Sequence, residues 1–295
     1  MANFSLSQLR GRSWLLAGPT NLGIVEGERG VYLIDSGNDK DAGRGVLKIL
    51  RERAWTLRAI VNTHSHADHI GGNRHLQENT NCEIWATRGE AAFVETPELE
   101  PALLWGGLPY AEIRSKFFEA KASHVTSIVV AGERREGLAF VGLRGHGLDM
   151  VGVLSPDGVF YLGDGLLGER TLEKHKIPYI YDVQAYREGL ARIRDTEAEL
   201  FVPSHGDPVG EIAPLVELNL ARVDEIAVVM LSLLAAEVSF EELLSALAKA
   251  FGLVLDGGAY VLVGHTLRSF LVWLRNEGRA DYRIVENRML WRAST

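Results

Sequence analysis

One segment limits what this chain can fold into more than any other. Residues 57–72 read LRAIVNTHSHADHIGG, a short apolar run followed directly by three histidines and an aspartate. The apolar run predicts a buried strand, and the residues after it predict the start of a helix. Side chains two residues apart leave an extended chain on the same side. The bend that follows brings four side chains toward one small volume: His64, His66, Asp68 and His69.

Three more side chains that can bind a metal follow predicted strands, and each of them stands next to glycine. His146 comes after LAFVGL, Asp164 after VFYLG, and His205 after LFVP. Glycine permits a tight turn there and a close approach of the backbone to a ligand. One such histidine alone is more often structural, but three in series after the histidine run favour a metal centre at one end of a sheet. Imidazole and carboxylate ligands suit zinc, iron or manganese.

The order of the predicted elements favours a layered α/β domain. Short strand-like segments within residues 13–37 are followed by a predicted helix at 41–53, a strand that ends at the histidines, and a helix at 73–78. Strand text resumes over 127–164. The pattern continues with a further helix and a strand that ends at His205. A mostly helical sequence follows to about Phe251, and then a helix at 265–278 and a hairpin around Asn287-Arg288.

Residues 97–123 interrupt this alternation, and we predict that they form an inserted lid. The segment carries four aromatic side chains: Trp105, Tyr110, Phe117 and Phe118. Two interpretations of these aromatics stay open with equal weight. They either line an apolar substrate pocket or pack a small subdomain.

Composition excludes several functional classes. The net charge of -8 over 295 residues argues against nucleic-acid binding, because an acidic surface repels phosphates. The single cysteine, Cys82, cannot form an intramolecular disulfide. The N-terminal text lacks the pattern of a signal peptide, and the most apolar run, 226–236, is too short to span a bilayer. We therefore expect a cytoplasmic protein without a membrane partner.

The ordered set H-x-H-x-D-H, G-H, G-D and H-G resembles the metallo-β-lactamase superfamily over about residues 10–210. The branch that it suggests contains glyoxalase II, the lactonases and the β-lactamase-like protein 2 group. The resemblance implies a four-layer αββα sandwich with a site for two divalent metal ions at the edge of its two sheets. Zinc is the first expectation, and iron or manganese are the alternatives.

The resemblance also implies a role for each candidate residue. His64, His66 and His146 would hold the first ion. Asp68, His69 and His205 would hold the second, and Asp164 would bridge the two. Asp35, in the family's early D-x-G turn, would be a buried residue near the site and not a ligand.

The implied reaction is attack by a metal-bridging hydroxide on a small ester, thioester or lactone. No G-x-S-x-G motif is present and Cys82 lies in strand text, so the sequence offers no Ser or Cys nucleophile. Asp68 is the candidate catalytic proton acceptor. Penicillin-cleaving members commonly have a cysteine where Asp164 stands, which argues against antibiotic hydrolysis. Gly147-Leu148-Asp149 replaces the family's T-P-G or S-P-G, so the substrate contacts there are expected to differ.

Two other functions remain open. A mononuclear iron enzyme of persulfide-dioxygenase type would need only His64, His146 and Asp164. A metal-dependent ribonuclease would use residues 239–295, which resemble a small winged-helix module appended to a catalytic domain at 1–238. This tail has only one more basic than acidic residue, so packing against the catalytic domain or homodimer formation is the simpler expectation. We expect no metal role for the remaining histidines: His75, His124, His175 and His265.

Overall fold

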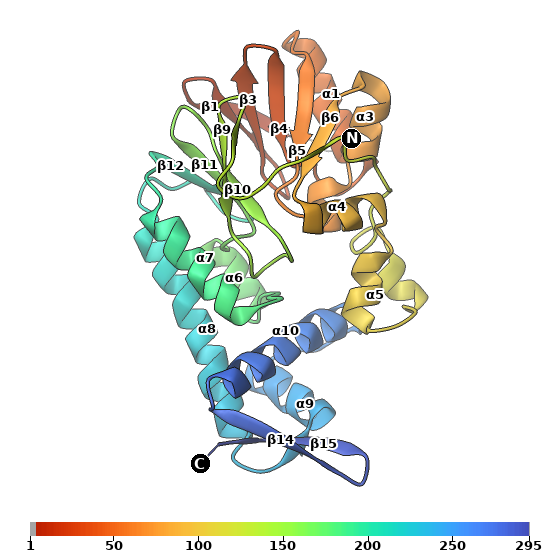
Figure 1. Ribbon diagram of the computed structural model, residues 1–295, viewed down its shortest axis with the longest axis vertical. Coiled ribbons are helices and arrows are strands. Elements are labelled where there is room, and N and C mark those ends of the chain that lie inside the picture. The colour runs from red at the N-terminus through yellow and green to blue at the C-terminus, as the bar shows by residue number, and fades with distance from the viewer. Residues whose placement is uncertain (1–3, 295) are drawn as a thin grey trace.

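The structure is a computed structural model that describes residues 4–294, and its centre is a pair of facing β-sheets (Figure 1). The first sheet has seven strands: β1 (Ser5–Arg10), β2 (Ser13–Ala17), β3 (Leu22–Gly27), β4 (Gly30–Ile34), β5 (Leu57–Val61), β6 (Glu83–Ala86) and β7 (Ser127–Ile128). The second has five: β8 (Arg134–Arg135), β9 (Leu138–Gly142), β10 (Val151–Leu154), β11 (Val159–Gly163) and β12 (Leu200–Pro203).

The pairing in the two sheets explains where helices are needed. Strands β1 to β4 are antiparallel neighbours joined by short turns, whereas β4, β5, β6 and β7 run parallel. Parallel neighbours require a crossover connection. Helix α1 (Lys40–Glu52) makes the first crossover, α2 (Ala67–Ile70) and α3 (Asn73–Thr80) make the second, and α4 (Arg88–Glu95) begins the third. In the second sheet β11 and β12 are parallel, and α6 (Glu169–His175) and α7 (Val183–Asp195) connect them.

Three apolar clusters define four layers. One cluster lies between the sheets and contains Tyr32 and Trp85 of the first sheet with Phe140 and Tyr161 of the second. Another joins the outer face of the first sheet to the two helices α1 and α3. The third covers the outer face of the second sheet with α7 and the C-terminal helices. This arrangement confirms the predicted αββα sandwich.

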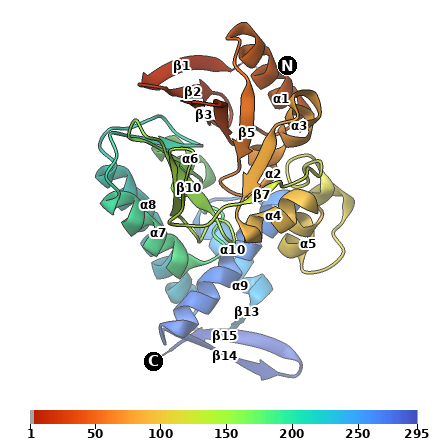
Figure 2. The same ribbon diagram turned by 45° about the horizontal axis from the view of Figure 1, so that its top comes forward.

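The C-terminal part adds α8 (Ala213–Leu233), β13 (Val238–Ser239), α9 (Phe240–Ala250), α10 (Gly257–Asn276), β14 (Ala280–Val285) and β15 (Arg288–Ala293). The order of these elements is helix, strand, two helices and two strands. The winged-helix resemblance of residues 239–295 remains a prediction. The β14–β15 hairpin lies at the end of the molecule opposite to β1–β3 (Figures 1 and 2). Its turn residues Glu286 and Asn287 both have positive φ, which matches the twist of a two-residue hairpin.

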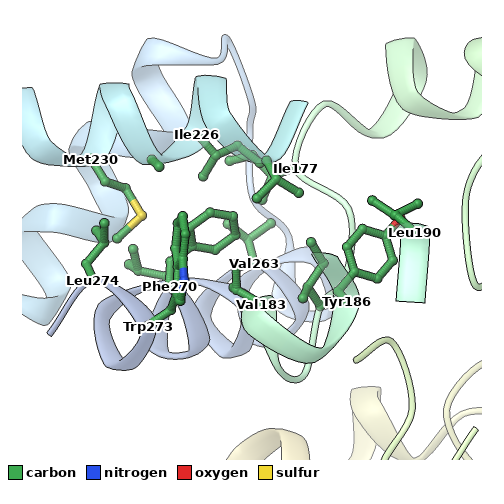
Figure 3. Packing of buried hydrophobic residues seen from close by; sticks show 14 of the residues in the cluster. Ile177, Val183, Tyr186, Leu190, Ile226, Met230, Val263, Phe270, Trp273 and Leu274 are labelled. Atoms are coloured by element: carbon green, nitrogen blue, oxygen red, sulfur yellow. The ribbon is translucent and has the colours of Figure 1, made fainter. Parts of the chain in front are cut away.

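One apolar cluster contains residues from both sides of position 238. Figure 3 shows Ile226 and Met230 of α8 against Phe270 and Leu274 of α10, and all four are fully buried or nearly so. The cluster continues to Tyr186 of α7 and so to the second sheet. The division of the chain at residue 238 remains a prediction, and the packing shows that the two parts share one core.

The element boundaries that differ from the sequence-based expectation include one end of α10 and one end of β7. Helix α10 begins at Gly257, eight residues before the predicted start, because the Asp256 side chain accepts from the Ala259 amide and caps it. The strand predicted at Ser127 ends at Ile128, since the Val130 amide donates to the Glu133 carboxylate and the chain turns. Within residues 4–294 no helix has the length and apolarity needed to cross a membrane.

Candidate metal centre

The histidine run lies where β5 ends, as the sequence predicts. His64 and His66 follow the strand in extended chain, and the short helix α2 then turns the backbone. The His69 and Ile70 amides donate to the His66 carbonyl and close this turn. The turn therefore points Asp68 and His69 toward the side on which His64 and His66 already lie.

Three histidine rings form the first group of side chains that could hold a metal: His64, His66 and His146. Nε2 of His64 lies 3.1 Å from Nδ1 of His66, and Nε2 of His146 lies 3.0 Å from the same Nδ1. A neutral imidazole has one N–H donor and one lone pair, so three rings meeting at one point cannot satisfy one another. A cation among the three nitrogen atoms would accept their lone pairs.

Asp68, His69 and His205 form another group whose ligand atoms lie close together, and Asp164 forms a third with His64 and His69, between the other two. The Asp68 carboxylate is 3.0 Å from Nε2 of His205. Asp164 places Oδ1 3.5 Å from Nε2 of His69 and Oδ2 3.3 Å from Nε2 of His146.

Two buried atoms of this centre lack a hydrogen-bond partner among the described residues: Nε2 of His69 and Oδ1 of Asp164. Buried polar atoms are normally paired, so unpaired atoms that face each other mark a place for a ligand. The donor set of imidazole nitrogens and carboxylate oxygens fits divalent zinc, iron or manganese.

The protonation states of the two groups differ: burial favours neutral histidine in the first group, whereas neighbouring carboxylates raise the pKa of the second group's histidines, His69 and His205. Burial lowers the pKa of His66 to about 3, and the His146 ring adds to the effect. Burial also lowers the pKa of His64 and of His146, so all three rings are held neutral, the form that binds metals. On the other side, the Asp164 carboxylate raises the pKa of His205 to about 9, and Asp68 reinforces the shift. Burial alone would raise the pKa of Asp68, but the neighbouring His69 and His205 hold it below the usual range.

Partners behind the rings fix which nitrogen faces inward. Nδ1 of His146 lies 3.1 Å from the Tyr179 carbonyl oxygen, which can only accept, so the proton is on Nδ1 and Nε2 is free. Nδ1 of His69 lies 2.8 Å from the Asp35 carboxylate, which leaves Nε2 directed at the centre. Asp35, buried as predicted, is a partner of a candidate ligand and does not reach the centre itself.

Gly145 allows His146 to reach this position. Its φ is 122°, and a Cβ atom there would lie 2.2 Å from the Tyr186 backbone nitrogen. The Gly145 carbonyl accepts from the Tyr181 and Asp182 amides, which precede α7. Any side chain at position 145 would push α7 away from the loop that carries His146.

A cavity of about 590 Å³ opens beside the centre. His66, Asp68, His146, Asp164 and His205 line one side of it. The rest of the lining is largely apolar, and part of it comes from the C-terminal part of the chain: Leu253, Val254, Leu255, Ala259, Leu262 and Val263.

The four aromatic residues of the 97–123 segment divide between different surroundings. Phe117 and Phe118 line the cavity beside the metal centre, whereas Trp105 and Tyr110 do not. Trp105 lines a separate pocket next to α10, and the Tyr110 hydroxyl donates to the Gly257 carbonyl. The segment itself contains α5 (Leu99–Trp105) and the 3₁₀ turn η1 (Ala111–Arg114). Its buried residues Leu104 and Ile113 pack with Val261 of α10.

The histidines that we predicted to lie outside the centre are at four separate places. His75 is half-buried on α3, and His124 is exposed, with Nδ1 3.0 Å from Glu95. His175 lines the outer part of the cavity, and His265 packs against the ring of Tyr179. None of the four belongs to a metal-capable group among the described residues.

Sequence reasoning missed Glu90, which joins the two loops that carry candidate ligands. Its carboxylate accepts from the Ser65 amide and hydroxyl, at 2.9 and 2.6 Å, and from the Asp149 amide at 2.7 Å. Asp149 in turn accepts from the Gly89 amide with its side chain, so it acts as a turn residue that binds α4. Nothing in the helical text around Glu90 distinguishes it from a solvent-exposed glutamate.

Tyr179 and Glu100 were also missed, and both contact the first group. The Tyr179 ring packs edge-on against His66 and His146. The Glu100 carboxylate is 3.4 Å from Nε2 of His66, and burial raises the pKa of Glu100 to about 8 with help from the charges of Glu90 and Asp68. A buried acid in the predicted lid segment carries no sequence signal of its own.

Comparison with known families agrees with this geometry. The model of the metallo-beta-lactamase superfamily matches residues 15–205, which hold all seven candidate ligands. The chain belongs to the metallo-beta-lactamase superfamily. This membership confirms the resemblance that the histidine and aspartate motifs indicated.

Curated relatives of this superfamily member match only part of it. A hydroxyacylglutathione hydrolase of Hyphomonas neptunium is 32% identical over 120 residues, which is 41% of this chain and 41% of the relative. The beta-lactamase-like protein 2 homolog of Drosophila melanogaster is 24% identical over 187 residues, 61% of this chain and 57% of the relative. The matched region thus spans about two fifths to three fifths of these relatives.

Solved structures extend the similarity of fold to almost the whole chain. A metallo-beta-lactamase family protein from Thermus thermophilus superposes with a TM-score of 0.77 at 20% identity and covers 95% of this chain and 98% of its own. A beta-lactamase domain protein from Burkholderia ambifaria gives 0.75 at 18% identity, over 98% and 94%. Both therefore share the fold, including nearly all of the C-terminal part.

Proposed function

We propose that this superfamily member is a hydrolase that cleaves a small ester, thioester or lactone at a pair of divalent cations, zinc in the first place. The observation that carries the proposal is the convergence of His64, His66 and His146 beside Asp68, His69 and His205, with Asp164 between the groups. Two bound cations supply a water nucleophile at neutral pH and polarise a carbonyl oxygen.

The two carboxylates of the centre have different tasks. The Asp164 side chain is 7% exposed and its oxygens face histidines of both groups, which supports a purely ligating role. The Asp68 side chain is 35% exposed, lines the cavity and accepts a hydrogen bond from the Thr20 hydroxyl through Oδ2. Asp68 is therefore the carboxylate that can take a proton from the nucleophile or pass it to the leaving group.

The cavity favours a substrate with an apolar part beside its scissile bond. Phe117, Phe118 and Leu262 supply apolar surface, while Lys174 and His175 add polar groups to its outer part. Several partial relatives are named hydroxyacylglutathione hydrolase, which supports a thioester within the proposed class. Antibiotic cleavage is not part of the proposal.

A hydrolysis screen tests the proposal. Zinc-loaded protein would be assayed against thioesters, lactones, phosphodiesters and β-lactams, together with His66→Ala and the control His124→Ala. We expect turnover of at least one thioester, ester or lactone, with kcat/KM reduced at least ~100-fold in His66→Ala because a ligand is lost. His124 lies on the surface, so its variant keeps wild-type turnover. Equal hydrolysis rates in the two variants would contradict the proposal.

Metal analysis separates the hydrolase from the iron dioxygenase alternative. Seven converging ligands favour two ions, whereas the dioxygenase would use only His64, His146 and Asp164. Protein purified without added metal is expected to bind two zinc ions per chain when titrated. One tightly held iron per chain, together with oxygen uptake on a persulfide, would contradict the hydrolase.

The ribonuclease alternative gains no support from the hairpin. Arg283 pairs with Glu237 at 2.5 Å, and Arg275 and Arg288 lie 3.6 and 3.8 Å from acidic partners, so these positive charges are largely balanced. We propose that the C-terminal part instead contributes to the cavity wall through residues 253–263. A gel shift with single-stranded RNA at low salt is expected to show no binding. Cytoplasmic location and homodimer formation remain predictions.

A further inference from the structure

Glu100 is a buried acid without a hydrogen bond from any described residue. It lies on α5, its side chain is 10% exposed, and it reaches the cavity beside the metal centre. The nearest polar partner of its carboxylate among the described residues is Nε2 of His66, 3.4 Å away. Burying an unpaired carboxyl group is costly in free energy, so a fold that keeps one here requires an explanation.

The orientation of the His66 ring supplies that explanation. Nδ1 of His66 faces Nε2 of His64 and of His146, so it is the atom that points into the first metal group. A neutral imidazole that offers its Nδ1 lone pair to a cation must carry its proton on Nε2. Nε2 of His66 lies 3.4 Å from the Glu100 carboxylate, longer than a typical hydrogen bond, and no other carboxylate among the described residues is paired with it.

The other two rings of the first group already have such partners. Nδ1 of His146 has the Tyr179 carbonyl at 3.1 Å, and Nδ1 of His64 has the Thr63 hydroxyl at 3.1 Å. Only His66 draws its partner from the 97–123 segment. Carboxylates behind a ligating histidine hold the ring in place and raise its basicity.

We propose that Glu100 is a positioning residue of the metal centre, which accepts the Nε2 proton of His66 and so couples helix α5 to binding of the first cation. The pairing makes α5 part of the centre although it supplies no ligand. It also gives the buried carboxylate a role that only the metal-loaded protein uses in full.

This proposal predicts effects of opposite sign on metal binding and on folding. Replacing Glu100 by alanine removes an acceptor from the loaded state, which weakens the first metal site. The same substitution removes an unpaired buried carboxyl from the metal-free state, which leaves the metal-free fold equally or more stable. A residue with a merely structural role would lower stability and leave the intrinsic metal affinity unchanged.

The test compares Glu100→Ala, Glu100→Gln and the control Glu98→Ala, whose glutamate is exposed at the start of α5. Zinc dissociation constants come from competition with a chromophoric chelator, and the stability of metal-free protein comes from urea unfolding. We expect Glu100→Ala to bind the first zinc about 10- to 100-fold more weakly. Glu100→Gln keeps a carbonyl acceptor and stays within about threefold of wild type, as does Glu98→Ala.

A second readout does not depend on stability. In zinc-loaded protein with ¹⁵N-labelled histidine, the His66 Nε2 proton is expected to exchange slowly with water in wild type and in Glu100→Gln, and faster in Glu100→Ala. Wild-type zinc affinity in Glu100→Ala, equal weakening in the alanine and glutamine variants, or unchanged exchange would each overturn the proposal. No measurement uses a substrate, so failure of the hydrolase proposal leaves this test intact.

Discussion

Asp35 adopts a backbone conformation that few residues other than glycine occupy. Its φ is 60°, directly after β4, and its carboxylate accepts from the Thr63 amide, the Thr63 hydroxyl and Nδ1 of His69, each at 2.8 Å. Aspartate tolerates the left-handed region better than most side chains. Three hydrogen bonds from one segment hold it there, so the strained residue directs His69.

Asp35→Asn tests this arrangement because it keeps the shape and removes one acceptor. A side-chain NH₂ would then face a donor, and the buried bonds to a charged group would be lost. We expect the free energy of unfolding to fall by about 2 to 3 kcal/mol. Affinity for the second zinc should fall about 10- to 100-fold. Urea unfolding and chelator competition measure the two effects, and Asp195→Asn at the exposed end of α7 should change neither.

His265 gives a pH-dependent contribution to stability. Its ring packs on Tyr179 and Tyr181, and burial lowers the pKa of His265 to about 4, with the Arg268 charge adding to the shift. The unfolded chain has an ordinary histidine pKa of about 6.5, so it takes up this proton first as the pH falls. The contribution is therefore complete above a pH of about 6.5 and is lost as the pH drops through about 4.

His265→Gln removes that contribution. For metal-free protein, the urea midpoint of wild type is expected to decline more steeply than that of the variant between about pH 6.5 and about pH 4.5. Comparing the two slopes cancels the contributions of the other histidines, because these titrate in both proteins. Parallel slopes would show that His265 is protonated as easily in the folded chain as in the unfolded one.

At the scale of single elements, helix α8 is tied to the loop after β11 by one buried side chain. Asn219 donates to the Leu167 carbonyl and accepts from the Leu167 amide, and the Tyr186 hydroxyl of α7 donates to the same oxygen. The loop begins at Asp164, so Asn219 holds the segment that follows a candidate ligand.

Asn219→Ala leaves a backbone amide, a carbonyl and a hydroxyl unpaired in the interior. We expect a loss of about 2 to 4 kcal/mol in unfolding free energy, because each buried unsatisfied group costs about 1 to 3 kcal/mol and the structure relaxes in part. Thermal and urea unfolding check this value. Asn276→Ala, at the exposed end of α10, serves as the control and should stay within about 0.5 kcal/mol.

The elements also show what could be predicted from the sequence. The strands before His64, His146, Asp164 and His205 are short apolar runs that end at glycine or at the ligands, so local pattern was enough to place them. The first two turns of α10 were missed because Gly257 and Gly258 have poor helix propensity and only the Asp256 cap and tertiary packing start the helix there.

Glu90 and Glu100 could not be predicted for a different reason. Each lies in a helix that also carries or adjoins an exposed glutamate, so its residue type is not distinctive. Its role arises only because segments far apart in the chain pack together. Phe117 and Phe118 line an apolar cavity, but no sequence pattern separates them from Trp105 and Tyr110, which face other surroundings. Such contacts depend on tertiary structure and not on local periodicity.

At the scale of the whole molecule, the candidate ligands come from both sheets. Four follow β5 of the first sheet, and His146, Asp164 and His205 follow β9, β11 and β12 of the second. Cations held by both sets would join the two sheets at one edge. Binding to the folded chain alone adds RT ln(1 + [L]/Kd), about 2.7 kcal/mol per site at about 100 times Kd.

Metal removal should therefore destabilise the whole sandwich. We expect the Tm to fall when zinc is chelated and to rise with the logarithm of free zinc when it is restored. His205→Ala, which removes a ligand of one site only, should retain part of this dependence. A Tm that is independent of zinc would mean that the ligands do not hold the sheets together.

The cavity walls have a consequence for how new activities can arise on this scaffold. Every candidate ligand lies before residue 206, whereas part of the apolar cavity lining comes from residues 253–263. Part of the selectivity is thus encoded in a stretch of the chain that holds no candidate ligand. Substitutions in the later stretch can reshape which molecules enter while the inherited chemistry is left untouched.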